Sequence, residues 1–249
     1  MKLLRLAAAA LCVFGGSAAV AADISVFSAG AVEPGLVKVA DQFRRETGHE
    51  VKIQFGTAPQ LAKRLAAGEA ADILIAPPAV VDEQVKNGKL IAEGRVTVGR
   101  VGVGVAVRNG MAPPDIASVD ALKRALLNAD SVVYNQASTG IYLEKLFDKL
   151  GIAEQIKPKA TRYANGAQVF EHVINGKGNE LGFGAITEIK TFEAKGLKLV
   201  GPLPAEVQNY TTYTAAVMTG AQAADVAREF VRYLGTGAAK GAFAAAGID

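Results

Sequence analysis

Short β-branched runs alternate with helical patterns along most of this chain, and this order constrains its fold more than any other feature. The predicted strands are residues 24–28, 51–55, 72–76, 131–134, 159–163 and 181–184. The predicted helices are residues 34–47, 59–67, 79–86, 140–150, 167–174, 222–234 and 238–246, and one further helix begins near Ser118 and includes Leu126. Strands joined through helices of this length run parallel. The sequence therefore predicts an α/β fold of mostly parallel sheets flanked by helices.

Two extended stretches interrupt this alternation. Residues 96–107 are mainly valines and glycines without a helical pattern, and residues 210–218 form a second extended stretch, rich in threonine. We interpret them as crossings between two lobes, near 101–107 and 203–213, that form a double hinge. The first lobe is then 23–100 plus 210–249, and the second is 101–209. One continuous doubly wound sheet is the alternative, and a mature length of roughly 227 residues permits either.

The first 22 residues have the layout of a secretory signal peptide. Lys2 and Arg5 precede a short apolar run, and small residues follow up to Ala22. Removal of this segment lowers the net charge from +3 to +1 and also removes Cys12, the single cysteine. Attachment of a lipid to Cys12 is the less favoured alternative, because Leu11 stands where a small residue is expected. We therefore predict an exported periplasmic protein without disulfides, nucleic-acid binding or membrane insertion.

Four junctions between a predicted strand and the next helix are small, polar and glycine-bearing. In open parallel sheets, ligands bind where strands end and helices begin. Free backbone N–H groups at the positive end of a helix dipole favour an anion there. Helix capping alone also accounts for each junction, but four of them in two lobes indicate a cleft. The junctions are residues 28–31, 56–59, 137–140 and 165–168.

Side chains for catalysis or metal binding are few. The chain lacks the nucleophile-elbow, zincin and phosphate-loop motifs, and it has only two histidines. We therefore predict no metal site and no cofactor. Asp72 and Glu33 are acids expected to flank the carboxyl ends of the strands, without an assigned role. Arg64, Arg100 and Arg162 are the cations best placed for a carboxylate.

Several segments together resemble the periplasmic molybdate-binding protein family. The resemblance covers nearly the whole mature chain and implies a two-lobed type 2 periplasmic binding protein. Such a protein closes by a hinge on a small anion and delivers it to an ATP-driven (ABC) importer, and we expect a monomer. The matching segments are residues 24–30, 43–48, 55–57, 61–62, 68–76, 139–142, 150–151 and 180–184.

The resemblance also implies a ligand site, although this chain lacks the hydroxyl side chains that the family places there. The family places a serine after each of the first two strands and a tyrosine after a late strand. Here those positions hold Ala31, residues 57–59 and residues 185–186. Each hydrogen bond to a charged group contributes about 1.5–3 kcal/mol, so an organic carboxylate in an enlarged pocket is favoured over molybdate. The expected ligand-binding residues are Ser28, Gly30, Ala31, Gly56, Thr57, Ala58, Ser138, Thr139, Gly140, Asn165, Ala167 and Ala185.

Two alternatives remain open at this point. Some exported proteins of the same superfamily are aconitate isomerases, which move a proton on a tricarboxylate without a cofactor. That reaction needs a base in the cleft, and the sequence alone identifies no catalytic residue. A protein that binds molybdate or tungstate is the second alternative.

Overall fold

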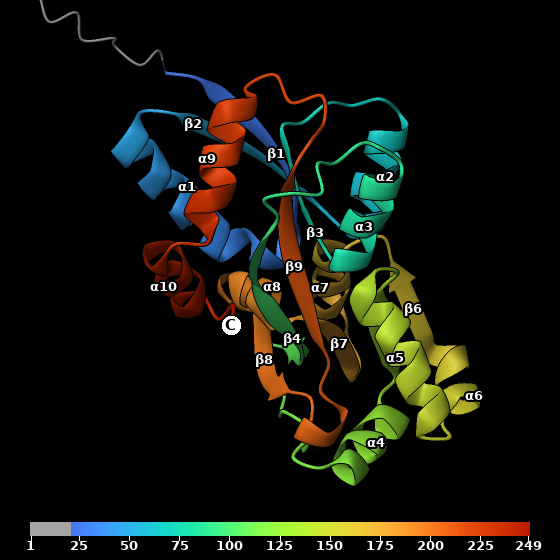
Figure 1. The fold of residues 1–249 in the computed structure, drawn as a ribbon. Coiled ribbons are helices and arrows are strands. Elements are labelled where there is room, and N and C mark those ends of the chain that lie inside the picture. Colours follow the sequence, from blue (N-terminus) through green and yellow to red (C-terminus); the bar gives the residue numbers. More distant parts are fainter. Residues whose placement is uncertain (1–20) are drawn as a thin grey trace, which may run out of the picture.

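The computed structural model describes residues 21–249 (Figure 1). The predicted signal peptide lies outside the described residues except for its last two positions. No helix within residues 21–249 combines the length and the apolar composition that a membrane crossing needs. The helices are α1 (Glu33–Thr47), α2 (Ala58–Ala66), α3 (Pro78–Lys86), α4 (Val119–Asn128), α5 (Ser138–Lys149), α6 (Ala153–Ile156), α7 (Gly166–Asn175), α8 (Ile186–Phe192), α9 (Ala224–Leu234) and α10 (Gly237–Ala245).

The strands of residues 21–249 form one hydrogen-bonded path in the order β2-β1-β3-β9-β4-β7-β5-β6, and β8 pairs with β4. Strand β8, which is short and mostly only partly buried, was not predicted from the sequence. The strands are β1 (Asp23–Ala29), β2 (Glu50–Gly56), β3 (Ile73–Ala76), β4 (Val96–Arg108), β5 (Ser131–Asn135), β6 (Ala160–Tyr163), β7 (Glu180–Ala185), β8 (Leu197–Pro202) and β9 (Tyr210–Val217).

The long strand β4 links two groups of strands. Its first half, up to Gly102, pairs with β9, and its second half, from Val103, pairs with β7 and β8. Figure 1 shows β4 and β9 running through the middle of the molecule between an upper lobe, with β1 to β3, and a lower lobe, with β5 to β8. The α/β two-lobed class is confirmed.

The sheet is mixed, which corrects the expectation of mostly parallel sheets. Strands β1, β2 and β3 run parallel to one another, as do β5, β6 and β7. By contrast, β4 and β9 run antiparallel to every strand they pair with. The reason is topological, because a chain that crosses between lobes and returns must lay its two crossing strands in opposite directions.

Helices cover both faces of the sheet in each lobe. In the first lobe, α1, α9 and α10 pack on one face around Phe43 and Phe230, and α2 and α3 pack on the other around Phe27. In the second lobe, α4, α5 and α6 cover one face, and α7 and α8 cover the other. Because both faces are covered, strands such as β3 are buried along their whole length and read as continuous apolar runs.

Two side-chain hydrogen bonds join the lobes. The Thr187 hydroxyl of α8 donates to the Ala31 carbonyl of the first lobe at 2.6 Å, and this contact is buried. The Thr57 hydroxyl donates to the Ala164 carbonyl of the second lobe at 3.3 Å, and this one is exposed. The lobes therefore contact each other at the ends of their strands, where the helices begin.

Candidate functional site

A small cavity of about 40 Å³ lies between the lobes at the carboxyl ends of the strands. Three of the four glycine-bearing junctions meet there, and the fourth, residues 165–168, borders a larger cavity beside it. The small cavity is lined by Ala29, Gly30, Ala31, Gly56, Thr57, Ala58, Pro77, Asn135, Ala137, Ser138, Thr139, Ala185, Glu188 and Tyr213.

The twelve expected ligand-binding residues fall into three groups. Asn165 and Ala167 line the larger cavity, whereas Ser28 and Gly140 line neither. The structure brings the other eight together around the small cavity. Those eight are Gly30, Ala31, Gly56, Thr57, Ala58, Ser138, Thr139 and Ala185.

Backbone N–H groups at two helix starts supply the small cavity with positive partial charge. Ala58 is the first residue of α2, and Ser138 and Thr139 are the first two of α5. The first N–H groups of a helix have no acceptor within the helix, and its dipole adds positive potential there. Lysine, arginine and histidine are all absent from the residues that line this cavity. An anion in it would therefore be held mainly by the backbone.

Two neighbouring N–H groups are already occupied. Thr57 N–H donates to the Gln60 Oε1 atom at 2.9 Å, and Ala137 N–H donates to the Asn135 Oδ1 atom at 2.9 Å. These side chains hold the two turns in place without a ligand. Fewer backbone N–H groups are therefore free to bind an anion than the four junctions in the sequence indicate.

Glu188 lies at the wall that the two cavities share, on the first turn of α8. Its carboxyl group fits between two glycines from opposite lobes. A β-carbon added to Gly30 would come within 2.7 Å of its Oε1 atom, and one added to Gly166 within 2.9 Å of its Oε2 atom. Burial raises the pKa of Glu188 to about 7, and the negative charge of Glu33 adds to this, against a hydrogen bond from the Ala185 backbone. Near neutral pH this carboxyl can both accept and donate a proton.

Tyr213 is the other ionisable side chain of the small cavity. It is buried, and burial together with the charge of Glu188 raises the pKa of its phenol well above the usual range. Tyr213 therefore stays a neutral hydroxyl at physiological pH. Elsewhere within residues 21–249, as here, no three His, Cys, Asp or Glu side chains gather as potential metal ligands.

Glu188 also lines the small cavity, beside Ala31 and Ala185, which stand at positions where the resemblance implies hydroxyls. The larger cavity, of about 520 Å³, is lined by Glu188 as well. The expectation of a pocket enlarged by the missing hydroxyls stays a prediction.

Ser28 and Gly140 have packing roles. The Ser28 side chain is fully buried, and its hydroxyl donates to the Ala29 carbonyl at 3.2 Å. A β-carbon at Gly140 would lie 1.7 Å from the Asn135 carbonyl oxygen. Because that oxygen belongs to the backbone, it cannot move aside as a side chain does. Gly140 lets α5 begin directly against the end of β5.

We expect the substitution Gly140→Ala to destabilise the protein by about 3 kcal/mol, the upper range for overpacking. Thermal or urea unfolding measures this effect. Gly241→Ala is the matched control, since Gly241 also lies in a helix and has no atom within 4 Å of an added β-carbon. The control is expected to gain about 0.5–1 kcal/mol from higher helix propensity. Equal unfolding midpoints for the two variants would contradict the close packing described here.

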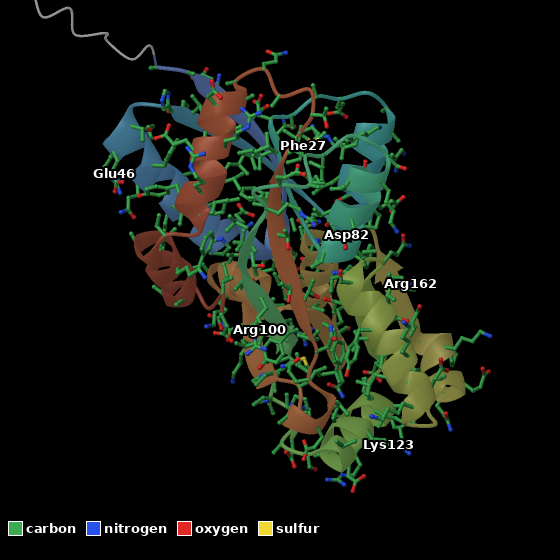
Figure 2. All side chains as sticks on the ribbon, viewed as in Figure 1. Phe27, Glu46, Asp82, Arg100, Lys123 and Arg162 are labelled. Atoms are coloured by element: carbon green, nitrogen blue, oxygen red, sulfur yellow. The ribbon has the colours of Figure 1, made fainter. Side chains whose placement is uncertain are left out.

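The candidate charged residues are spread over the molecule. Arg64 and Glu33 do line the larger cavity. Arg162 forms an ion pair with Glu144 at 3.0 Å, and the Arg100 guanidinium stacks on the Tyr210 ring at 4.5 Å. Neither arginine lines either of the two cavities (Figure 2). The placement expected for Asp72 is wrong, because this residue precedes β3 and lies at the amino end of that strand.

Sequence reasoning missed Glu188, Asn135 and Pro77. The end of β7 is not a small, polar, glycine-bearing junction, because Ala185 is followed by the apolar Ile186. An acidic residue three positions after a fully buried strand was the available signal for Glu188. That signal is weak, since many helices carry an acidic residue in their first turn.

The comparisons with known proteins agree with this architecture. Residues 24–249 match the family model of bacterial extracellular solute-binding proteins. The chain belongs to this family. Within it, the resemblance to the molybdate-binding proteins is confirmed: the chain is 26% identical over 239 residues to the molybdate-binding protein ModA of Escherichia coli K12, covering 94% of this chain and 91% of that protein.

Two further relatives extend the comparison. The chain is 31% identical over 219 residues to an aconitate isomerase of a Pseudomonas species, which covers 85% of this chain and 81% of that enzyme. The solved structure of the Azotobacter vinelandii periplasmic molybdate-binding protein has a TM-score of 0.74 at 18% identity, covering 91% of this chain and 98% of that chain. This solute-binding fold of the ABC-transporter type therefore includes relatives that bind an anion and a relative that acts on one.

Proposed function

We propose that this protein binds a small organic polycarboxylate between its lobes and isomerises it by proton transfer, as an aconitate isomerase does. The observation that carries the proposal is Glu188, a carboxyl group with a pKa near neutral at the wall between two adjoining cavities. The relative named aconitate isomerase supports the substrate class. We further propose that the protein is exported to the periplasm through residues 1–22.

The charges of the site favour an acid–base role for Glu188. A carboxylate of the ligand would accept hydrogen bonds from the free N–H groups of Ser138 and Thr139 at the start of α5. Glu188, when protonated, can donate a hydrogen bond to the same anion. When ionised it can accept a proton from a carbon next to the carboxylate. A group whose pKa lies near the working pH is best suited to do both.

The reaction needs no co-reactant. The Glu188 carboxylate takes a proton from the methylene carbon of aconitate, and the electron pair of that C–H bond shifts the double bond along the three-carbon unit. The carboxyl group then returns the proton to the carbon that was vinylic. One C–H bond breaks, another forms, and the composition of the substrate is unchanged.

The same geometry disfavours a tetrahedral oxyanion such as molybdate. The positions where the related binding proteins are expected to use serine or tyrosine hold Ala31, residues 57–59 and residues 185–186, and among these only Thr57 has a hydroxyl. Fewer hydroxyl donors lower the affinity for molybdate. An ionised Glu188 repels every anion in the cleft, so the preference for an organic acid rests on the missing hydroxyls and not on this charge.

Binding without turnover, for delivery to an ABC importer, is the second candidate. The family match and the ModA relative favour it. The two candidates share their ligand class and differ in whether Glu188 exchanges a proton with carbon.

Incubation of the purified mature protein with trans-aconitate or cis-aconitate separates the two. We expect conversion to the other isomer over many turnovers, followed by ultraviolet absorbance and by proton NMR. In D₂O, solvent exchange at Glu188 should place deuterium in the product. Calorimetric binding of aconitate without conversion would favour the transport receptor, and molybdate binding without aconitate binding would contradict the proposal.

A further inference from the structure

The larger cavity has the size and the walls of an organic ligand site. Its volume of about 520 Å³ lies within the range typical of small-molecule pockets. Phe55 and Leu61 of the first lobe face Phe170 and Phe192 of the second across it. It shares Gly30, Gly56, Thr57 and Glu188 with the lining of the small cavity, so the two cavities lie side by side.

The small cavity cannot hold a polycarboxylate alone. Its volume of about 40 Å³ corresponds to roughly three water molecules, which is enough for one carboxylate group. The remainder of an organic acid must therefore lie beyond Glu188. The larger cavity, which shares four lining residues with the small one, offers that space.

One cation of the larger cavity is available to a ligand. Arg64 is already engaged: its Nε atom donates to Glu69 at 2.8 Å, and its guanidinium stacks on the Phe27 ring at 4.1 Å. Lys63, the neighbouring residue on α2, has no side-chain hydrogen bond or ion pair within the described part of the chain. Glu33 and Glu188 also line the larger cavity, so its walls carry acidic side chains as well as the basic Lys63 and Arg64.

We propose that the larger cavity is a second subsite, which holds the distal carboxylate of the same ligand, and that Lys63 determines its specificity. This inference rests on the proposed function for its ligand class. The first carboxylate lies at the start of α5, the carbon chain passes Glu188 along the aromatic wall, and the distal carboxylate pairs with the Lys63 ammonium. The protein would thereby prefer acids with two or more carboxylates over acids with one.

Lys63→Gln tests the subsite in the full mature protein. We expect the Kd for trans-aconitate, measured by calorimetry, to rise about five- to tenfold, the loss of one partly screened charge pair. The affinity for crotonate, which has a single carboxylate and is measured by competition, should change less than twofold. Lys63→Arg, which keeps the charge, should recover most of the affinity for trans-aconitate.

Lys38→Gln is the matched control, because Lys38 is an exposed lysine of the same lobe that lines neither cavity. Its Kd for trans-aconitate should stay within twofold of the wild type. Unchanged aconitate affinity in Lys63→Gln, or equal losses for aconitate and crotonate, would overturn the subsite. Failure of the proposed function gives a different result. A wild-type protein that binds aconitate but does not convert it would contradict the isomerase, while the dependence of binding on Lys63 would still support the subsite.

Discussion

Replacing Glu188 by glutamine is expected to abolish turnover of aconitate while leaving its binding within a few-fold of the wild type. Glutamine keeps the shape of the side chain between Gly30 and Gly166 but cannot accept a proton from carbon. General acid–base catalysis contributes about 10²–10⁴-fold to a rate, so kcat should fall by about a thousandfold or more. Steady-state kinetics and calorimetry measure the two effects on the same sample.

The wild-type rate should also depend on pH through this carboxyl. Because Glu188 must be ionised to take the proton, kcat/KM for aconitate is expected to rise with pH up to about 7 and then level off. The groups that face it are Glu33 of α1 and Tyr213 of β9. Tyr213 stays neutral throughout this range and does not contribute to the rising limb. A profile that is flat between pH 5 and 8 would argue against Glu188 as the base.

The same substitution is expected to stabilise the fold above pH 7. The pKa of Glu188 is higher in the folded protein than the value of about 4.3 in an unfolded chain. Between these two values the folded state keeps a proton that the unfolded chain has released, so the free energy of unfolding falls as pH rises. Well above pH 7 the full penalty of about 3–4 kcal/mol is present in the wild type and absent from Glu188→Gln.

Thermal unfolding at two pH values checks this expectation. At pH 8 the variant should melt about 6–15 °C above the wild type, and at pH 4.5 the two should nearly coincide. Glu229→Gln on the exposed side of α9 is the matched control, and its melting temperature should not change in this way. A lower stability of Glu188→Gln at pH 8 would show that the ionised carboxyl is well solvated or well paired, and it would remove the basis for its acid–base role.

The second large effect concerns Asp72, whose carboxylate ties three separate segments together. Its Oδ2 atom accepts from the Ser25 N–H at 2.7 Å and from the Ser25 hydroxyl at 2.8 Å. Its Oδ1 atom accepts from the N–H groups of Gln222 at 2.7 Å and Ala223 at 3.3 Å. Asp72 thus fixes the starts of β1 and β3 and the turn before α9. Burial by itself would raise the pKa of Asp72, but these hydrogen bonds outweigh it and hold the pKa below its usual range.

Asp72→Asn is expected to destabilise the protein by about 3 kcal/mol, because its amide group faces N–H donors and leaves two of them without an acceptor. This corresponds to a loss of roughly 6–12 °C in Tm. Since the pKa is lowered in the folded state, the stabilisation by Asp72 is present above the unfolded pKa of about 3.9 and is lost as pH falls through the folded value. The difference between the two proteins should therefore be complete at pH 6 and shrink below pH 4.

Asp148→Asn provides the comparison, because Asp148 is exposed on α5 and makes no side-chain hydrogen bond or ion pair in the described part of the chain. Its unfolding midpoint should stay within about 0.5 kcal/mol of the wild type, as is usual for surface substitutions. Equal effects of the two substitutions would mean that the Asp72 contacts contribute no net stability.

Most elements of this fold follow from local patterns in the sequence. Apolar residues at helical spacing, with Pro34 at the start and Gly48 at the end, predict α1 to within a residue, since such signals act within a single turn. The strand β8 was missed because a short strand that is mostly only partly buried has no strong alternation to reveal it. The antiparallel direction of β4 and β9 was also missed, because strand direction depends on the path of the chain and not on local propensity.

The sequence alone determined the alternation of strands and helices, the family resemblance, and the small glycine-bearing turns that end the strands. Each of these features depends on residues that are only a few positions apart, so it can be recognised in the sequence. Only the tertiary structure placed Glu188 of the second lobe beside Gly30 of the first and divided the cleft into two cavities. It also left Lys63 without a side-chain partner among residues 21–249. The pKa of a carboxyl group is decided by the burial and the charges that distant segments bring around it, and no local pattern records them.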